Sequence, residues 1–315
     1  MTLASFLHFV ELRTKVASVL PFLFGTLYAL WRYGALDPLN LALMLAALLC
    51  IDMATTASNH YTDYLKAVQK TGYNYERHNT LVRDGLSLET AFRTIVGLVV
   101  LGMASGLLLA LRTDGVVLAV GVFSFGVGLL YSWGPIPISR TPFGEAVSGL
   151  MMGFVIVFLS AYIHVPDPDW VVVGLSYPSL TVRLQLVELG RIFLVSLPLV
   201  FGIANIMLSN NICDQEEDRV NGRLTLPILI GRQKGLKLSA ALYGAIPAAV
   251  TAGMLLGWLP LTAGVSLLGV PVLVKHWRQF AAVPTKEKTF VLSVKSFLLT
   301  AALYCIGLAL ALMLP

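Results

Sequence analysis

Residues 192–219 read IFLVSLPLVFGIANIMLSNNICDQEEDR, an apolar run that leads directly into one of the most polar segments of the chain. With the residues just before it, the run approaches the roughly 20 residues that a helix needs to cross a bilayer. Asn210, Asp214 and Asp218 are each four residues apart, so they share one face if the helix continues past Leu208. Two carboxylates and an amide in that arrangement suit a hard cation such as Mg²⁺, although a solvated acidic helix end has the same pattern.

The composition places the whole chain in a membrane. Its 315 residues are 57% hydrophobic and only 12% charged, whereas an average soluble domain is about 25% charged. The basic residues are spread over short loops and form no patch interleaved with aromatics, which excludes a nucleic-acid-binding protein. Cys50, Cys213 and Cys305 have no metal-binding spacing, so they are interpreted as unpaired small hydrophobic residues. We therefore expect the chain to be embedded in a lipid bilayer.

Continuous apolar stretches of spanning length predict an all-α, polytopic membrane protein that forms a single domain over residues 1–315. Nine such stretches occur, at roughly residues 15–33, 39–60, 88–111, 114–133, 143–163, 188–210, 234–256, 259–277 and 289–313. Residues 164–187 are expected to form a loop between the fifth and sixth helices. Two other loops, 61–87 and 211–233, are long and polar.

The distribution of basic residues predicts the orientation. If the N-terminus is cytoplasmic, nine spans place 18 of the 22 Lys and Arg on the cytoplasmic side, and only Arg32, Arg112, Arg183 and Arg191 on the other. The two long polar loops then lie in the cytoplasm and the C-terminus lies outside. The sequence therefore predicts a multi-pass protein of the cell membrane whose acidic loops face the cytoplasm.

A second polar cluster comes at the end of the second predicted helix. Asp52, Thr55, Asn59 and Asp63 form a stripe along it, and an ionisable residue inside a span usually faces a cavity. Asn59 and Asp63 repeat the four-residue spacing of the later cluster, so two Asn/Asp clusters are expected on one membrane face. Such a pair suits a diphosphate bound through Mg²⁺, with Asn59, Asp63, Asn210, Asp214 and Asp218 as metal ligands. Nearby cations would neutralise the leaving group, although each is equally an ordinary cytoplasmic loop charge; the candidates are Lys66, Arg83, Arg140, Arg219 and Arg223.

These motifs resemble a known family. Asn59-x-x-x-Asp63 and Asp214-x-x-x-Asp218 are similar to the two aspartate-rich motifs of the UbiA superfamily of intramembrane prenyltransferases. Further stretches resemble the menaquinone-pathway (MenA, 1,4-dihydroxy-2-naphthoate polyprenyltransferase) branch of that superfamily. They are Ala17-Ser18-x-x-Pro21 with Gly25-Thr26, residues 81–85 (LVRDG), residues 131–137 (YSWGPIP) with Gly144-Glu145, and Asn210-Asn211-Ile212-x-Asp214 with Gly222-Arg223-x-Thr225-Leu226.

The resemblance implies an Mg²⁺-dependent transfer of a polyprenyl group from polyprenyl diphosphate to a small aromatic acceptor. It implies nine helices around a central cavity, and 1,4-dihydroxy-2-naphthoate as the acceptor, decarboxylated in menaquinone biosynthesis. Asp63, Asp214 and Tyr131 would be catalytic, and an aromatic face such as that of Tyr131 tolerates the allylic cation without trapping it. The acceptor or prenyl cavity would include Asp52, Tyr61, Trp133, Glu145 and Asn211.

One departure and several alternatives stay open. Members of the superfamily commonly carry another acid after the first motif, but positions 67 and 69 are Ala67 and Gln69, so Glu76 is a candidate replacement. Other acceptors are 4-hydroxybenzoate, homogentisate, haem or a lipid. From other classes, a non-catalytic scaffold leaves the paired clusters unexplained. A cation-coupled secondary transporter would use Asp52 at the bilayer midplane, whereas the acidic clusters lie at one membrane face. Prenyl chain length and oligomeric state are not encoded in any motif.

Overall fold

Helices long enough to cross a membrane dominate the structure, a computed structural model that describes residues 1–66, 80–132, 134, 136–176 and 178–314. Seven helices in these ranges are long and apolar enough to be membrane spans: Pro38–Thr62, Leu88–Arg112, Gly115–Ser132, Gly144–Tyr162, Leu186–Cys213, Arg232–Leu255 and Phe290–Met313. Each coincides with one of the nine predicted stretches. Because the backbone hydrogen bonds of a helix are satisfied within the segment, apolar stretches of this length form helices in lipid.

The other two predicted stretches are also helical but are not among the seven. The first is helix α2 (Val16–Tyr33), which contains Pro21. The eighth begins as a 3₁₀ helix, η4 (Leu261–Gly269), and continues as helix α14 (Val270–Ala282). The prediction of nine spans therefore stays a prediction.

The chain divides into two compact units, each built from two separate parts of the sequence. The first unit comprises residues 1–18 and 42–134, and the second comprises residues 19–41 and 135–315. Three connections in the sequence thus link the units: one inside α2, one near the start of α3 (Pro38–Lys66) and one after Gly134. The expectation of a single domain stays a prediction.

The first unit packs short N-terminal helices onto α3 and α6. Phe9 and Val10 are fully buried, and they lie in hydrophobic clusters with Ala54 and Ala57 of α3 and with residues of α6. Ser87 caps α6 by accepting the backbone N–H of Thr90, as N-cap serines do. The elements, besides most of α3, are α1 (Leu3–Phe9), η1 (Leu12–Lys15), α5 (Thr80–Arg83), α6 (Leu88–Arg112) and α7 (Gly115–Ser132).

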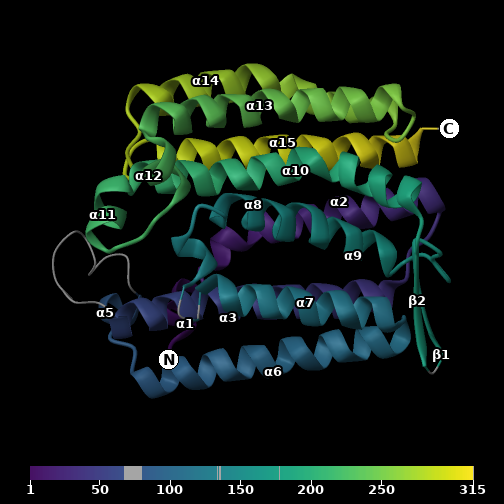
Figure 1. Cartoon of the computed structure of the whole chain (residues 1–315), viewed down its shortest axis with the longest axis horizontal. Coiled ribbons are helices and arrows are strands. Elements are labelled where there is room, and N and C mark those ends of the chain that lie inside the picture. The colour runs from purple at the N-terminus through teal and green to yellow at the C-terminus, as the bar shows by residue number, and fades with distance from the viewer. Residues whose placement is uncertain (67–79, 133, 135, 177, 315) are drawn as a thin grey trace. The chain divides into compact units, whose positions relative to one another are not determined.

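The second unit is built around α10 (Leu186–Cys213), the most buried of the seven candidate spans. Figure 1 shows α10, α13, α14 and α15 side by side, and α10 contacts both α13 and α15. The other elements are η2 (Ile138–Arg140), α8 (Gly144–Ser148), η3 (Gly149–Val155, a π-helical segment), α9 (Ile156–Tyr162), α11 (Gln215–Val220), α12 (Leu226–Ile230), α13 (Arg232–Leu255) and α15 (Phe290–Met313).

Glycine allows η3 to approach α10 closely. A Cβ at Gly153 would lie 2.5 Å from the backbone N and Cα of Val200, a distance that real Cβ atoms do not reach. Small residues at helix contacts let backbones approach in this way in membrane proteins. This contact positions α8, which precedes η3, beside the last turns of α10.

A β-hairpin replaces the loop predicted at residues 164–187. Strands β1 (Val171–Ser176) and β2 (Ser179–Leu184) pair antiparallel, with Val171 opposite Leu184 and Ser176 opposite Ser179. The prediction was wrong because it treated this polar-flanked segment only as a connection between spans. Its β-branched residues on both sides of Pro178 favour strands joined by a turn.

Candidate functional site

The polar segment after α10 bends at Asp214 and does not continue as one helix. α10 ends one residue earlier, Asp214 has φ −92° and ψ 8°, and α11 starts at the next residue. Asn210 still shares a turn with Asp214, because its Nδ2 donates to Asp214 Oδ2 over 3.2 Å. Lys286, between α14 and α15, pairs with the same carboxylate. The single helix face expected through Asn210, Asp214 and Asp218 is thus interrupted, and Asp218 belongs to a separate short helix.

Asp218 is held by a tight turn that ends in Arg223. The Asp218 carboxylate is 3% exposed, and its Oδ1 lies 3.2 Å from Arg223 Nε. The Arg223 backbone N–H donates to the Asp218 carbonyl over 2.8 Å. Gly222 makes this turn possible because its φ of +65° lies in the left-handed region that glycine adopts without strain. Arg223 also donates from Nη2 to the carbonyl of Ser139 over 3.2 Å, which ties the turn to η2.

The electrostatic setting of Asp218 favours a cation beside it. Burial raises the pKa of its carboxyl group above the ordinary value, the Arg223 guanidinium opposes this, and the neighbouring Asp214 carboxylate adds to it. Its second oxygen, Oδ2, is buried without a hydrogen-bond partner. A buried carboxylate oxygen without a donor is costly unless a cation or a proton compensates it.

Glu145 and Asn211 form a buried pair next to this cluster. Asn211 in the last turn of α10 donates from Nδ2 to Glu145 Oε1 over 2.9 Å, and the two residues are 1% and 5% exposed. Glu145 Oε2 and Asn211 Oδ1 have no hydrogen-bond partner. The carboxylates of Glu145 and Asp218 interact electrostatically. Three buried oxygens without a hydrogen-bond partner, Glu145 Oε2, Asn211 Oδ1 and Asp218 Oδ2, thus belong to this part of the second unit.

This donor set is chemically suited to a hard cation. Carboxylate and amide oxygens are the protein ligands of Mg²⁺, which commonly takes one or two carboxylates and completes its shell with phosphate oxygens and water. Asp214 and Asp218 supply two carboxylates, and the unpartnered Oδ2 of Asp218 is a free acceptor. Within the described part of the chain, no group of three or more His, Cys, Asp or Glu side chains is arranged to hold a metal. A metal here would therefore need ligands from outside this set.

The first predicted motif is described only in part. Asn59 lies on α3 and is exposed. The backbones of Asp63 and Lys66 lie in the last turns of α3, but their side chains, like Trp133 and Glu76, lie outside the described residues. The expectation that two clusters bind one diphosphate stays a prediction.

Asp52 is engaged in a buried ion pair. Lys15 Nζ lies 2.7 Å from Asp52 Oδ1 and 2.5 Å from the Thr56 hydroxyl, and the Ser18 hydroxyl donates to Asp52 Oδ2 over 2.6 Å. The side chains of Lys15 and Asp52 are 4% and 20% exposed. Asp52 therefore joins the N-terminal segment to α3, and its expected place in a substrate cavity stays a prediction.

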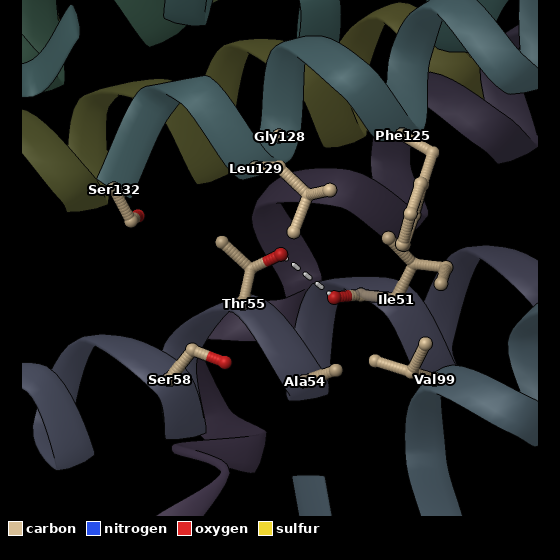
Figure 2. A pocket seen from close by; sticks show the side chains of 9 residues that line it. All are labelled: Ile51, Ala54, Thr55, Ser58, Val99, Phe125, Gly128, Leu129 and Ser132. Carbon is tan, nitrogen blue, oxygen red and sulfur yellow. Dashed lines mark hydrogen bonds between the residues drawn. The ribbon is translucent and has the colours of Figure 1, made fainter. Parts of the chain in front are cut away.

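A small cavity of about 40 Å³ lies among α3, α6 and α7 in the first unit. Figure 2 shows Leu129 and Phe125 of α7 facing Thr55 and Ile51 of α3 across it. Thr55, from the predicted polar stripe, donates its hydroxyl to the Ile51 carbonyl over 2.9 Å. The space suits a few water molecules and is too small for a prenyl chain. Tyr61 is partly buried and packs on the cluster that contains Phe9, and its expected place in a substrate cavity stays a prediction.

Arg83 forms a surface ion pair with its neighbour. Arg83 Nε lies 2.9 Å from Asp84 Oδ1, and His8 Nδ1 lies 3.3 Å from Asp84 Oδ2. The hydrogen bond from Arg83 holds the pKa of Asp84 below its usual value. Because such exposed pairs contribute little to stability, Arg83 remains available to a ligand at small cost.

Tyr131 and Arg140 are half-buried. Tyr131 lies in the last turn of α7, and the Arg140 carbonyl accepts the backbone N–H of Leu224 over 2.9 Å. The turn after α11 is thereby attached to η2 at two points, through Arg140 and through Arg223.

The sequence pattern predicts no site role for three residues that the structure places beside the predicted site residues. Lys286 pairs with Asp214, Lys15 pairs with Asp52, and Gln215 donates to the Pro227 carbonyl over 2.6 Å. Both lysines were counted only as cytoplasmic loop charges. A single sequence carries no signal that pairs Lys286 with a residue 72 positions away.

Comparisons of this chain with a family model and with a known protein indicate the same family. The model of the UbiA prenyltransferase family matches residues 18–300. The chain is 31% identical over 230 residues to the 1,4-dihydroxy-2-naphthoate octaprenyltransferase of Bacillus subtilis (strain 168), which covers 73% of this chain and 67% of that protein.

Solved structures share the fold. The apo structure of a UbiA homologue from Aeropyrum pernix K1 has a TM-score of 0.68 at 22% identity, over 96% of this chain and 97% of that one. A UbiA homologue from Archaeoglobus fulgidus bound to GPP and Mg²⁺ has a TM-score of 0.63 at 13% identity, over 98% and 100% of the two chains. At these identities the likeness establishes the fold alone.

Proposed function

Because this chain belongs to the UbiA prenyltransferase family, we propose that it transfers a polyprenyl group from a polyprenyl diphosphate to 1,4-dihydroxy-2-naphthoate. The observation that carries the choice of acceptor is the 31% identity to the Bacillus subtilis enzyme of that name. In the reaction the allylic C–O bond breaks and its electron pair leaves with diphosphate. The aromatic ring forms the new C–C bond, and its carboxylate leaves as CO₂. The product belongs to menaquinone biosynthesis.

We assign the metal-binding role to Asn210, Asp214 and Asp218, together with Asn59 and Asp63. The buried, unpartnered Oδ2 of Asp218 supports this assignment, and the related protein from Archaeoglobus fulgidus was solved with Mg²⁺. Bound there, Mg²⁺ would neutralise the charge that develops on the departing diphosphate. The donor set fits that ion because it consists of carboxylate and amide oxygens.

The basic residues supply positioned positive charge. Arg223 is fixed by Asp218 and by the Ser139 carbonyl, so its guanidinium needs little reorganisation to meet a phosphate oxygen. Lys286 pairs with Asp214 and would turn to a phosphate when a metal takes that carboxylate. Arg140 belongs to η2, which the turn that carries Arg223 also contacts. We assign diphosphate binding to Arg223 and Arg140, with Lys66 and Arg83 from the first unit.

The remaining predicted residues keep their proposed roles at the acceptor and the prenyl chain. Tyr131 would face the allylic cation, which an aromatic ring stabilises through its face. Asp52, Tyr61, Trp133, Glu145 and Asn211 were expected to surround the acceptor. For Glu145 and Asn211, the buried hydrogen bond between them supports a different contribution, which is to hold the last turn of α10 that carries Asn210.

We place the protein in the cell membrane with nine transmembrane helices around a central cavity and a cytoplasmic N-terminus. Both acidic segments would then face the cytoplasm. Seven helices of spanning length and the family membership support a multi-pass membrane protein. The excess of Lys and Arg on one side of the predicted spans supports the orientation.

The test is an assay of the purified protein in detergent with Mg²⁺, a polyprenyl diphosphate and a panel of aromatic acceptors. We expect the naphthoate to give a prenylated naphthoquinol, detected as demethylmenaquinone after oxidation, and we expect Asp63→Ala and Asp214→Ala to abolish it. Glu216→Ala is the matched control, because Glu216 is an exposed acid on α11 and should be dispensable. Activity that persists in both aspartate variants would overturn the metal–diphosphate assignment. Product with 4-hydroxybenzoate but not with the naphthoate would overturn the acceptor.

A further inference from the structure

The hairpin of β1 and β2 is amphipathic. In the paired register, Val171 faces Leu184 and Val173 faces Val182, and cross-strand partners project on the same side of a hairpin. We call these four residues the apolar face. Three of them, Val173, Val182 and Leu184, are about half exposed in the second unit. The hairpin therefore presents a row of partly exposed apolar side chains among the described residues of that unit.

The opposite face is polar. It carries the pairs Val172–Arg183, Gly174–Thr181 and Ser176–Ser179. A Cβ at Gly174 would lie 2.7 Å from the Thr181 hydroxyl oxygen, so Thr181 lies over Gly174 on this side. Arg183, Thr181 and Ser179 are all exposed. The division into one apolar and one polar face is thus shared by both strands.

The base of the hairpin is attached where two candidate membrane spans end. One span ends at Tyr162 and the next begins at Leu186. Trp170, directly before β1, is 3% exposed and packs on the rings of Tyr33 and Tyr162 at 5.1 Å and 5.5 Å. The Gln185 backbone N–H donates to the Trp170 carbonyl over 2.9 Å and closes the base. The hairpin therefore starts from the level at which α9 and α10 leave the membrane.

The direction of the hairpin places it along the membrane surface. Figure 1 shows β1 and β2 running across the direction of α10 and α15, not along it. If those two helices cross the bilayer, strands that run across them lie roughly in the plane of its surface. Leu186 and Val187, the first residues of α10, are also strongly exposed, so the apolar face continues into the surface of a span.

We propose that the apolar face of this hairpin rests on the lipid bilayer, at the interface between headgroups and acyl chains. In the described part of the chain the sheet has only these two strands, so each has an outer edge without a neighbouring strand. Such an edge is costly in hydrocarbon and satisfied among headgroups and water. An isolated two-stranded hairpin is only marginally stable in water, so contact with lipid also explains how it is maintained. The polar face then points to water. This proposal depends on membrane insertion alone and not on the enzymatic function.

Spin labels on the two faces test the proposal in the full chain reconstituted in phosphatidylcholine vesicles. In a cysteine-free background, Val173→Cys and Val182→Cys place a label on the apolar face, and Ser179→Cys and Thr181→Cys place one on the polar face. All four positions are exposed, so the label displaces no core side chain. Leu107→Cys, at a 52% exposed position within the candidate span α6, provides the lipid standard.

Collision rates with oxygen, which concentrates in lipid, and with a water-soluble nickel chelate give the result. We expect the ratio of oxygen to nickel collisions at 173 and 182 to exceed that at 179 and 181 several-fold and to approach the ratio at 107. Nickel accessibility at 173 and 182 equal to that at 179 and 181 would overturn the proposal, because the apolar face would then lie in water. Low accessibility to both reagents at 173 and 182 would also overturn it, since the face would then be packed against protein.

Discussion

The ion pair between Lys15 and Asp52 makes a quantitative prediction about the first unit. Lys15 is almost completely buried, and its ammonium contacts the Asp52 carboxylate and the Thr56 hydroxyl. Lys15→Met leaves a carboxylate that keeps only the Ser18 hydroxyl as donor. Removing one partner of a buried pair typically costs about 3–5 kcal/mol. Because Asp52 retains 20% exposure and the Ser18 bond, we expect the lower end, about 3 kcal/mol.

A double-mutant cycle separates the ion pair from its surroundings. Asp52→Leu alone leaves a buried ammonium and should also cost about 3 kcal/mol or more. The double variant removes both charges, so its free energy of unfolding should return to within about 1 kcal/mol of the wild-type value. The control is Arg93→Met on α6, where both partners of the Arg93–Glu89 pair are more than two-thirds exposed and the expected loss is at most about 0.5 kcal/mol.

The assay is reversible unfolding in mixed detergent micelles, followed by prenyl transfer with the same proteins. Single variants that lose less than about 1 kcal/mol would refute the reasoning, because no buried charge would then have been left uncompensated. The prenyl-transfer activity of the double variant then distinguishes a structural role of Asp52 from a role in the acceptor cavity. A double variant that is stable and active assigns Asp52 to structure, whereas one that is stable and inactive assigns it to the acceptor cavity.

Three further predictions concern separate features. Glu145→Leu should lower stability by about 1–3 kcal/mol because it leaves the Asn211 amide buried without an acceptor, while Glu145→Gln keeps the acceptor and most of the stability. Equal thermal unfolding midpoints for the Leu and Gln variants would contradict this. The hydrogen bond from the preceding guanidinium lowers the pKa of Asp84, so its stabilisation is present above about pH 3.9 and is lost as the pH falls through the lower folded value. Asp84→Asn should therefore lose stability relative to wild type at neutral pH and converge with it in acid, and a gap that is independent of pH would count against the pairing. Gly153→Ala should cost about 1–3 kcal/mol because its Cβ would meet the α10 backbone, whereas Gly244→Ala, with open space around it, should be neutral or slightly stabilising; similar effects at both glycines would disprove the close contact.

The spans were predictable because helix formation in lipid is a local property. A run of apolar residues must satisfy its own backbone hydrogen bonds, so length and composition suffice to identify it. Seven of the nine predicted stretches became helices of spanning length. The hairpin was missed although its β-branched residues and the turn at Pro178 are local signals, because the segment was treated only as a connection between two spans.

The sequence by itself determined the seven helices of spanning length, the polar segment that follows α10, and the family that its motifs resemble. Only the tertiary structure decided which partner each acid meets. Asp214 pairs with Lys286, Asp218 with Arg223, and Glu145 with Asn211. Glu145 and Asn211 are 66 positions apart, and they meet because the glycines of η3 let α8 lie against α10.

Residues 192–219 show the same division. Their spacing predicted Asn210, Asp214 and Asp218 on one helix face, but the chain bends at Asp214 and the turn at Gly222 brings Arg223 to Asp218. The physical reason is that spacing along a helix describes only local geometry. A buried carboxylate is stabilised by a donor that is distant in the sequence and that the fold places beside it. A single sequence does not specify which donor that is.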